Sequence, residues 1–272
     1  MTSVANKMQA YAKTQNVQQV YLHLLRDLVH LSSDQGLKTI EIFSLPPFDA
    51  KLLSRISKEM KDLISPFKTS CHLPFADPNI DSFHAEVRKT ARKEIKDVIE
   101  LISDMGIKSA VMHPGCRDVI YPEFYAFFGQ DSKKNIENAT DELVSFCKQR
   151  KVSLAIENMP SPDPFYTKPE EFVPLVKKGA SITLDPAHAL FSKVNPINFI
   201  KKFKNRIAEV HLQDATKSPS KEMLQLGTGD VDYLGVLNSL SEIDFKGCII
   251  IEVNSEKAAI KSLDLIRKAG YL

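Results

Sequence analysis

Short apolar runs alternate with longer amphipathic segments from Gly36 to the end of the chain. Runs of this length that are rich in Ile, Val and Leu are typical of buried strands, and they lie at 37–43, 67–73, 107–113, 152–158, 181–185, 207–213 and 248–253. The segments that follow them have helical periodicity near 49–64, 82–104, 132–150, 168–178, 196–203, 231–240 and 256–269. Strands that are buried on both faces and separated by helices form a parallel sheet.

An earlier βα unit would raise the number of strands to eight. Its helix is clear, because 21–35 (YLHLLRDLVHLSSDQ) is amphipathic and ends at Gly36. The candidate for its strand, 4–12 (VANKMQAYA), has a pattern that fits a helix nearly as well. The length of 272 residues is close to the roughly 250 of one (β/α)8 barrel. The sequence therefore predicts an α/β fold, a (β/α)8 TIM barrel over 1–272 as a single domain, with its first strand the weakest element.

The composition favours a folded chain with a sizeable hydrophobic core and shows no bias towards a charged partner. Hydrophobic residues make up 43% of the chain, and 36 Lys and Arg against 34 Asp and Glu leave a net charge of +2 without a basic run. Nothing in this pattern indicates nucleic acid or a membrane as a partner. The chain starts without the apolar core of a signal peptide, and its four cysteines form no paired motif. We expect a cytoplasmic protein, and we leave a homo-oligomer open because the exposed helices of barrels often pair.

Polar side chains close the predicted strands. In a barrel of this kind the carboxyl ends of the strands and the loops after them form the active site. Six strands end in His, Asp or Glu, and Glu41 lies inside the first clear strand; the six are His72, His113, Glu157, Asp185, His211 and Glu252. Any one of them alone would be an ordinary polar strand end, but six at equivalent positions indicate a site.

Carboxylates and imidazoles that converge on one point repel each other or shift their pKa values unless a cation lies among them. A divalent metal ion resolves that conflict. The three carboxylates of this set, together with one of its histidines, suit a fairly hard ion such as Mn²⁺, Mg²⁺ or Co²⁺, and Zn²⁺ is compatible with the same ligands.

The same strand ends carry a family resemblance. The segments CHLPF, VMHPG, AIENMP, TLDPAHA, EVHLQDA, LGTGDVDY and IIIEV occur in this order between 71 and 253. Together they resemble the xylose isomerase-like barrel superfamily, which includes sugar isomerases, sugar epimerases and endonuclease IV. No single segment is specific, whereas the ordered set is, and the likeness runs from about Gly36 to the C-terminus.

The resemblance implies a role for each matching residue. The metal ligands would be the carboxylates and the imidazole at the ends of the last four strands: Glu157, Asp185, His211 and Glu252. In the sugar isomerases and epimerases the two glutamates are also catalytic, since one removes a proton from a sugar or sugar phosphate and the other returns it through an enediol. His188 would bind a substrate hydroxyl, and Lys217 would be an oxyanion partner.

A second reading is an endonuclease IV-like zinc phosphodiesterase that acts on abasic DNA. His72 and His113 match a pair that would bind a second metal with a bridging Glu157, and His188 matches a ligand of a third. The remaining ligands of that third metal, an Asp and a His, are missing from 217–224 (KSPSKEML). His72 and His113 could equally bind substrate. A metal-dependent lyase or dehydratase on the same scaffold is the other alternative, because the fold alone does not select the chemistry.

Overall fold

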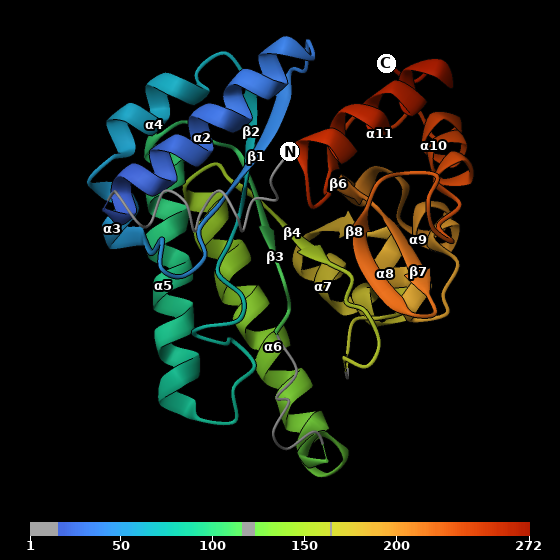
Figure 1. Cartoon of the computed structure of the whole chain (residues 1–272). Coiled ribbons are helices and arrows are strands. Elements are labelled where there is room, and N and C mark those ends of the chain that lie inside the picture. The colour runs from blue at the N-terminus through green and yellow to red at the C-terminus, as the bar shows by residue number, and fades with distance from the viewer. Residues whose placement is uncertain (1–15, 116–122, 164) are drawn as a thin grey trace.

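The structure, a computed structural model, describes residues 16–115, 123–163 and 165–272. Seven parallel strands form its main sheet in the spatial order β1-β2-β3-β4-β5-β6-β9. Their bounds are β1 (Thr39–Phe43), β2 (Lys68–His72), β3 (Ser109–Met112), β4 (Ser153–Glu157), β5 (Ser181–Leu184), β6 (Ile207–Leu212) and β9 (Cys248–Ile251). The two outer strands, β1 and β9, also contact each other. The sheet is therefore a nearly closed barrel, with helices on its outside (Figure 1).

This arrangement confirms the predicted barrel. Each of the seven strands predicted after Gly36 is present, within two residues of its predicted bounds. The candidate first strand, 4–12, lies outside the described residues. Neighbouring strands keep one register along most of their paired length. Strands β1 and β2, for example, pair from Thr39 opposite Lys68 to Phe43 opposite His72. Their carboxyl ends therefore open onto one mouth.

Helices connect the strands and cover their outer faces. They are α2 (Val17–Asp34), α3 (Ala50–Ser54), α4 (Ser57–Ile64), α5 (Ala85–Asp104), α6 (Phe124–Gln149), α7 (Val173–Lys178), α8 (Pro186–Phe191), α9 (Pro196–Phe203), α10 (Tyr233–Glu242) and α11 (Glu256–Lys268), with short 3₁₀ turns at Pro169–Phe172 and Lys204–Arg206. Side chains cap several of them, as where Asn16 accepts the N–H of Gln19 at α2. In the part of the chain that the structure describes, no helix is long and apolar enough to cross a membrane.

Two elements beside the mouth were missing from the prediction. Helix α8 follows β5 directly: Asp185 caps it by accepting the N–H of His188, and Pro186 occupies its first position. This helix is too short for hydrophobic periodicity to reveal it. The stretch after β6, where no strand was predicted, is an antiparallel hairpin of β7 (Asp214–Lys217) and β8 (Ser220–Leu224). Its second strand is mostly exposed and polar, so it lacks the apolar run that marks a buried strand.

A buried carboxylate fixes the loop that follows the hairpin. Asp214 is fully buried and accepts the backbone N–H groups of Ala215 at 2.8 Å, Thr228 at 3.0 Å, Gly229 at 2.8 Å and Val231 at 3.0 Å. A Cβ atom on Gly229 would lie 2.4 Å from the carbonyl oxygen of Ala215, so this position requires glycine. Gly229 of the LGTG segment thus serves the turn.

We expect Asp214→Asn to lower the free energy of unfolding by about 2–3 kcal/mol, because an amide group places donors against N–H groups that now face a carboxylate. Urea denaturation of both proteins measures this difference. Asp230→Asn is the control, since Asp230 is exposed and accepts one N–H, from Lys217. Equal losses in the two variants would contradict a special role for Asp214.

Candidate metal centre and active site

Four polar side chains from the last four strands of the barrel lie at its mouth. Glu157 ends β4, His211 is the last but one residue of β6, and Asp185 and Glu252 directly follow β5 and β9. Because these strands are parallel and adjacent in the sheet, their carboxyl ends lie on the same side. The structure therefore brings the four residues predicted as metal ligands to one end of the barrel.

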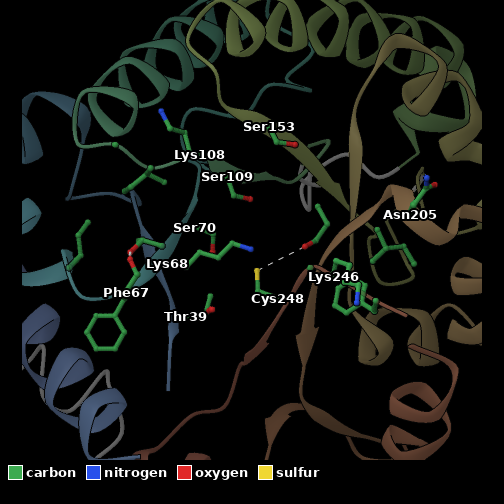
Figure 2. Close-up of a pocket in the computed structure, with 18 of the residues that line it drawn as sticks. Thr39, Phe67, Lys68, Ser70, Lys108, Ser109, Ser153, Asn205, Lys246 and Cys248 are labelled. Carbon is green, nitrogen blue, oxygen red and sulfur yellow. Dashed lines mark hydrogen bonds between the residues drawn. The ribbon is translucent and has the colours of Figure 1, made fainter. Parts of the chain in front are cut away.

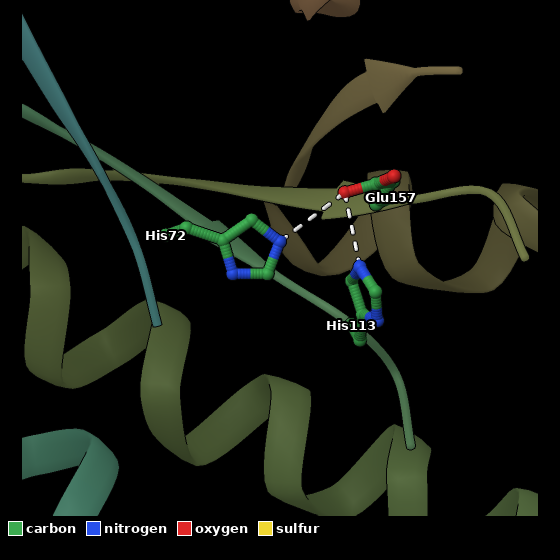
Figure 3. Close-up of side chains that lie close together, drawn as sticks. All are labelled: His72, His113 and Glu157. Atoms are coloured by element: carbon green, nitrogen blue, oxygen red, sulfur yellow. Dashed lines mark hydrogen bonds and ion pairs between the residues drawn. The ribbon is translucent and has the colours of Figure 1, made fainter. Parts of the chain in front are cut away.

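Glu157 lies at the centre of a ring of imidazoles. It is 1% exposed, and its Oε2 lies 3.5 Å from Nε2 of His72, 3.2 Å from Nε2 of His113 and 3.3 Å from Nδ1 of His211. Its Oε1 lies 3.2 Å from Nδ1 of His188. Figure 3 shows His72 and His113 directed at the same carboxylate from two neighbouring strands. The structure therefore brings both histidines, which were predicted from their strand ends, beside Glu157.

His211 connects the mouth with the interior of the barrel. Its Nδ1 lies 3.4 Å from Oε2 of Glu252 as well as beside Glu157. Its Nε2 lies 3.4 Å from Oε1 of Glu41 and 3.4 Å from Oε1 of Glu209. The ring is 1% exposed, yet neither of its nitrogens has a hydrogen-bond partner of good geometry among the described residues. Four carboxylates thus surround one imidazole.

A network of hydrogen bonds holds Asp185 in place. Its backbone N–H donates to Oδ1 of Asn158 at 2.7 Å, and the amide of Asn158 donates back to the carbonyl oxygen of Asp185 at 2.9 Å. Its Oδ2 accepts Nε2–H of Gln213 at 2.6 Å, and Gln213 accepts the N–H of Met223, on β8, at 2.6 Å. Its Oδ1 caps α8 by accepting the N–H of His188 at 2.8 Å. Both carboxylate oxygens of Asp185 therefore accept a hydrogen bond, and the hairpin helps to position the donor on Gln213.

The protonation of the site reflects its crowding. Burial by itself would raise the pKa of Glu157, but the charges of His211 and His113 hold it well below its usual value. Burial would lower the pKa of His211, but the carboxylates that face it, Glu157 first, raise it well above its usual value. The pKa of His188 is raised to about 10 in the same way, by Asp185 and Glu157 against burial. Burial raises the pKa of Asp185 to about 6. Protons on His211 and His188 thus compensate the buried carboxylates, whereas burial lowers the pKa of His113.

The donor set suits a divalent cation. Buried nitrogen atoms without hydrogen-bond partners, such as those of His211, are rare unless an ion or another group uses them. Among the described residues, three groups place one ligand atom of each member within 4.8 Å of the others: His72, His113 and Glu157; Glu41, Glu209 and His211; Glu157, Asp185 and His188. Imidazole and carboxylate donors in this mixture match Mn²⁺, Co²⁺ or Zn²⁺, and carboxylates alone match Mg²⁺.

Lys217 stands apart from the other predicted residues. It is exposed at the end of β7, and its backbone N–H donates to Oδ2 of Asp230 at 2.9 Å. Its role as an oxyanion partner stays a prediction. His188, in contrast, lies in the site, where its Nδ1–H donates to the carbonyl oxygen of Asn158 at 2.9 Å.

Sequence reasoning missed three residues of the site. Glu209, Gln213 and Asn158 are all buried, and none closes a strand. The alternation of side chains along a strand would have pointed to two of them, since Glu209 and Gln213 lie two residues either side of His211 and share its direction. Asn158 had no such signal, because its role depends on the course of the loop after β4.

Comparisons with known proteins agree with this architecture. The model of the xylose isomerase-like TIM barrel matches residues 29–269. The chain belongs to this family. It is 30% identical over 205 residues to an uncharacterized protein of Methanocaldococcus jannaschii, and the matched region covers 72% of this chain and 68% of that protein. It is 31% identical over 101 residues to inosose dehydratase of Clostridium tetani, or 31% of this chain and 34% of that one. A crystal structure described as a D-tagatose 3-epimerase-like protein matches with a TM-score of 0.76 at 26% identity, over 87% of this chain and 89% of that chain. The resemblance drawn from the ordered strand-end segments is therefore confirmed.

The raised pKa of His188 makes the stability of the metal-free protein depend on pH. An imidazolium with a pKa of about 10 in the folded state and 6.5 in the unfolded state stabilises the fold fully below pH 6.5, and this stabilisation is lost as the pH rises towards 10. We expect Tm to fall between pH 7.5 and 10, and to fall less steeply in His188→Gln. Calorimetry of the metal-free proteins measures both slopes.

The matched control is His84→Gln, because His84 is exposed at the start of α5. This variant should keep the slope of the wild-type protein. A slope in His188→Gln that equals the wild-type slope would show that this imidazole does not gain its proton on folding.

Proposed function

We propose that this protein is a metal-dependent sugar or sugar phosphate isomerase or epimerase that transfers a proton through an enediol. The observation that carries the proposal is that Glu157 and Glu252 both lie beside one buried imidazole nitrogen, Nδ1 of His211, at 3.3 and 3.4 Å. Two carboxylates in this position could exchange a proton with opposite faces of a substrate bound between them. The family of the chain and its likeness to a D-tagatose 3-epimerase-like structure support a sugar as the substrate class.

The ligands of the cation would be the four residues on the last strands, Glu157, Asp185, His211 and Glu252. A divalent ion bound there would polarise a carbonyl group and its neighbouring hydroxyl, which lowers the pKa of the adjacent C–H bond. Mn²⁺, Mg²⁺, Co²⁺ and Zn²⁺ are the candidates. Binding would release the protons that the imidazoles hold, because a metal-bound histidine uses a nitrogen lone pair.

The remaining side chains would bind and orient the substrate. The side chain of Glu252 is 34% exposed whereas that of Glu157 is 1% exposed, so Glu252 is the carboxylate that a substrate reaches first from solvent. His188 keeps its proton at neutral pH because of its raised pKa, and it would donate a hydrogen bond to a sugar hydroxyl. Phe75 lies against the ring of His113, with centroids 4.3 Å apart, and would exclude water beside it.

The first test is proton exchange at carbon. In D₂O with Mn²⁺, we expect the protein to exchange the C–H proton beside the carbonyl of a ketose or ketose phosphate, which ¹H NMR detects. Glu157→Gln and Glu252→Gln should each slow this exchange by roughly 10²–10⁴-fold, since each removes a proton-transfer group. Removal of divalent ions with EDTA should abolish it, and added Mn²⁺ should restore it.

Thr140→Val is the matched control for these variants. Thr140 is fully buried on α6 and its hydroxyl has no hydrogen-bond partner in the described structure, so this variant should exchange at the wild-type rate. Wild-type exchange in Glu157→Gln or Glu252→Gln would contradict the two-glutamate mechanism. A product that has lost water instead of changing configuration would favour the dehydratase alternative, which the similarity to inosose dehydratase also raises.

A second candidate function is metal-dependent phosphodiester hydrolysis at abasic sites. The observation that favours it is that His72 and His113 both face Oε2 of Glu157, at 3.5 and 3.2 Å, where a second metal ion could bind. This function would require both histidines as ligands, whereas the isomerase requires neither.

A nicking experiment separates the two functions. If hydrolysis is the function, the protein with Zn²⁺ should cut a duplex that contains an abasic site, and EDTA should prevent the cut. We expect no cleavage above background, because 217–224 supplies neither the Asp nor the His that a third metal would need. Cleavage that His72→Ala and His113→Ala both abolish would overturn the isomerase assignment.

A further inference from the structure

A buried glutamate lies beneath the candidate metal centre, and neither the proposed chemistry nor the ligand set uses it. Glu209 is on β6, two residues before His211, so the two side chains point to the same interior face of the barrel. Its side chain is fully buried. A carboxylate at such a position is costly unless specific partners compensate it, and an apolar side chain would fill the barrel without that cost.

Two other strands of the barrel supply those partners: β9, which pairs with β6, and β2, which does not. Ser70 on β2 donates its hydroxyl to Oε1 of Glu209 at 3.0 Å, and Cys248 on β9 donates its S–H to Oε2 at 3.2 Å. Ser70 and Cys248 also line a cavity of about 750 Å³ at the opposite, amino-terminal end of the barrel, where Figure 2 shows them close to one another beside Lys68. Both carboxylate oxygens of Glu209 therefore accept a hydrogen bond from a side chain that lines this cavity.

The anchored carboxylate faces one side of the His211 ring. Oε1 of Glu209 lies 3.4 Å from Nε2 of His211, whereas Nδ1 of the ring faces Glu157 and Glu252. A neutral imidazole carries one N–H, and the group that accepts this N–H decides which nitrogen keeps a free lone pair. Nε2 has no hydrogen-bond partner of good geometry in the described structure; with a proton on Nε2 and Glu209 as its acceptor, the lone pair of Nδ1 would point to the two glutamates of the candidate metal centre.

We propose that Glu209 is a positioning residue that holds Nε2–H of His211 and so directs Nδ1 to a divalent cation at the barrel mouth. The inference rests on the proposed function insofar as it assumes that this cation binds. Carboxylates that accept the second N–H of a metal-binding histidine fix the orientation of its ring and increase its basicity, and their removal typically weakens metal binding by about 10–100-fold.

Glu41 is the other carboxylate beside Nε2 of His211, at 3.4 Å. Its Oε2 has no hydrogen-bond partner among the described residues, in contrast to the two anchored oxygens of Glu209. Glu209 is therefore the better acceptor for Nε2–H. The three side chains could instead hold a second cation of their own, and the test below distinguishes this outcome.

The experiment is a titration of the metal-free protein with Co²⁺, followed by visible absorption and by calorimetry. The wild-type protein should bind one equivalent, and Glu209→Gln should bind it about 10–100-fold more weakly. Glu209→Asp, which keeps the charge but shortens the side chain, should bind with intermediate affinity. If Glu209→Gln does not fold, the Co²⁺ affinity of Glu209→Asp tests the proposal in its place.

Thr183→Val is the matched control for a change inside the barrel. Thr183 pairs with Glu209 across the β5–β6 ladder, is fully buried, and has a hydroxyl without a hydrogen-bond partner in the described structure. Its isosteric replacement should leave the Co²⁺ affinity and the absorption spectrum unchanged. Tm of each metal-free variant separates a loss of affinity from a loss of stability.

A second measurement reports on the ring of His211 itself. In Zn²⁺-loaded protein labelled with ¹⁵N-histidine, we expect a slowly exchanging, downfield Nε2–H signal that is assigned to His211 by its absence from His211→Gln. This signal should shift upfield in Glu209→Gln and stay in place in Thr183→Val. A merely structural role of Glu209 would not move it.

Each outcome decides one of the two proposals. Unchanged Co²⁺ affinity and an unchanged Nε2–H signal in Glu209→Gln would overturn the positioning role and leave the proposed function intact. Tight binding of two equivalents, reduced to one in Glu209→Gln, would make Glu209 a ligand and also overturn it. A wild-type protein that binds no divalent ion would overturn the proposed function, and the positioning role with it.

Discussion

The contact between Glu157 and the imidazoles around it is the interaction on which the site depends. A carboxylate that is 1% exposed has lost almost all of its hydration, and this loss costs several kcal/mol unless charges of the opposite sign lie beside it. His72 and His211, whose pKa values are raised, supply those charges from two strands. Burial lowers the pKa of His113, which contributes a hydrogen bond to the same carboxylate from a third strand. The barrel brings them together because its parallel strands end at one mouth, so the fold and the electrostatics of the site are not separable.

A network of neutral hydrogen-bond donors, amide side chains and backbone N–H groups, supports this arrangement. Asn158 and Gln213 hold Asp185 by its backbone and by one carboxylate oxygen. The hairpin reaches back to the mouth through Met223, which donates to Gln213. Asp214 then fixes the loop after the hairpin with four backbone hydrogen bonds. The irregular segment after β6 is therefore a support for the site and not a simple connection.

The sequence predicts those parts of the molecule that repeat. Apolar runs at regular intervals gave the seven strands, and the polar residue at the end of each strand gave Glu157, Asp185, His211 and the other members of the site, because one rule governs every strand of a parallel barrel. The parts that the sequence does not predict are local. Helix α8 is only six residues long, and Asp185 both follows a strand directly and caps that helix, so a single residue belongs to two patterns at once.

The interior residues show a different limit of sequence reasoning. Glu209 and Glu41 occur within strands, where a glutamate is usually taken to face solvent, and only the closure of the barrel turns both towards His211. Period-two alternation relates Glu209 to His211, but it does not supply the hydroxyl of Ser70 or the thiol of Cys248, which come from strands far away in sequence. Buried carboxylates of this kind oppose folding unless a partner needs them. Glu41 and Glu209 lie beneath His211, whose other nitrogen faces the barrel mouth. Their position argues that the barrel interior orients the His211 ring and that this orientation lowers the stability of the fold.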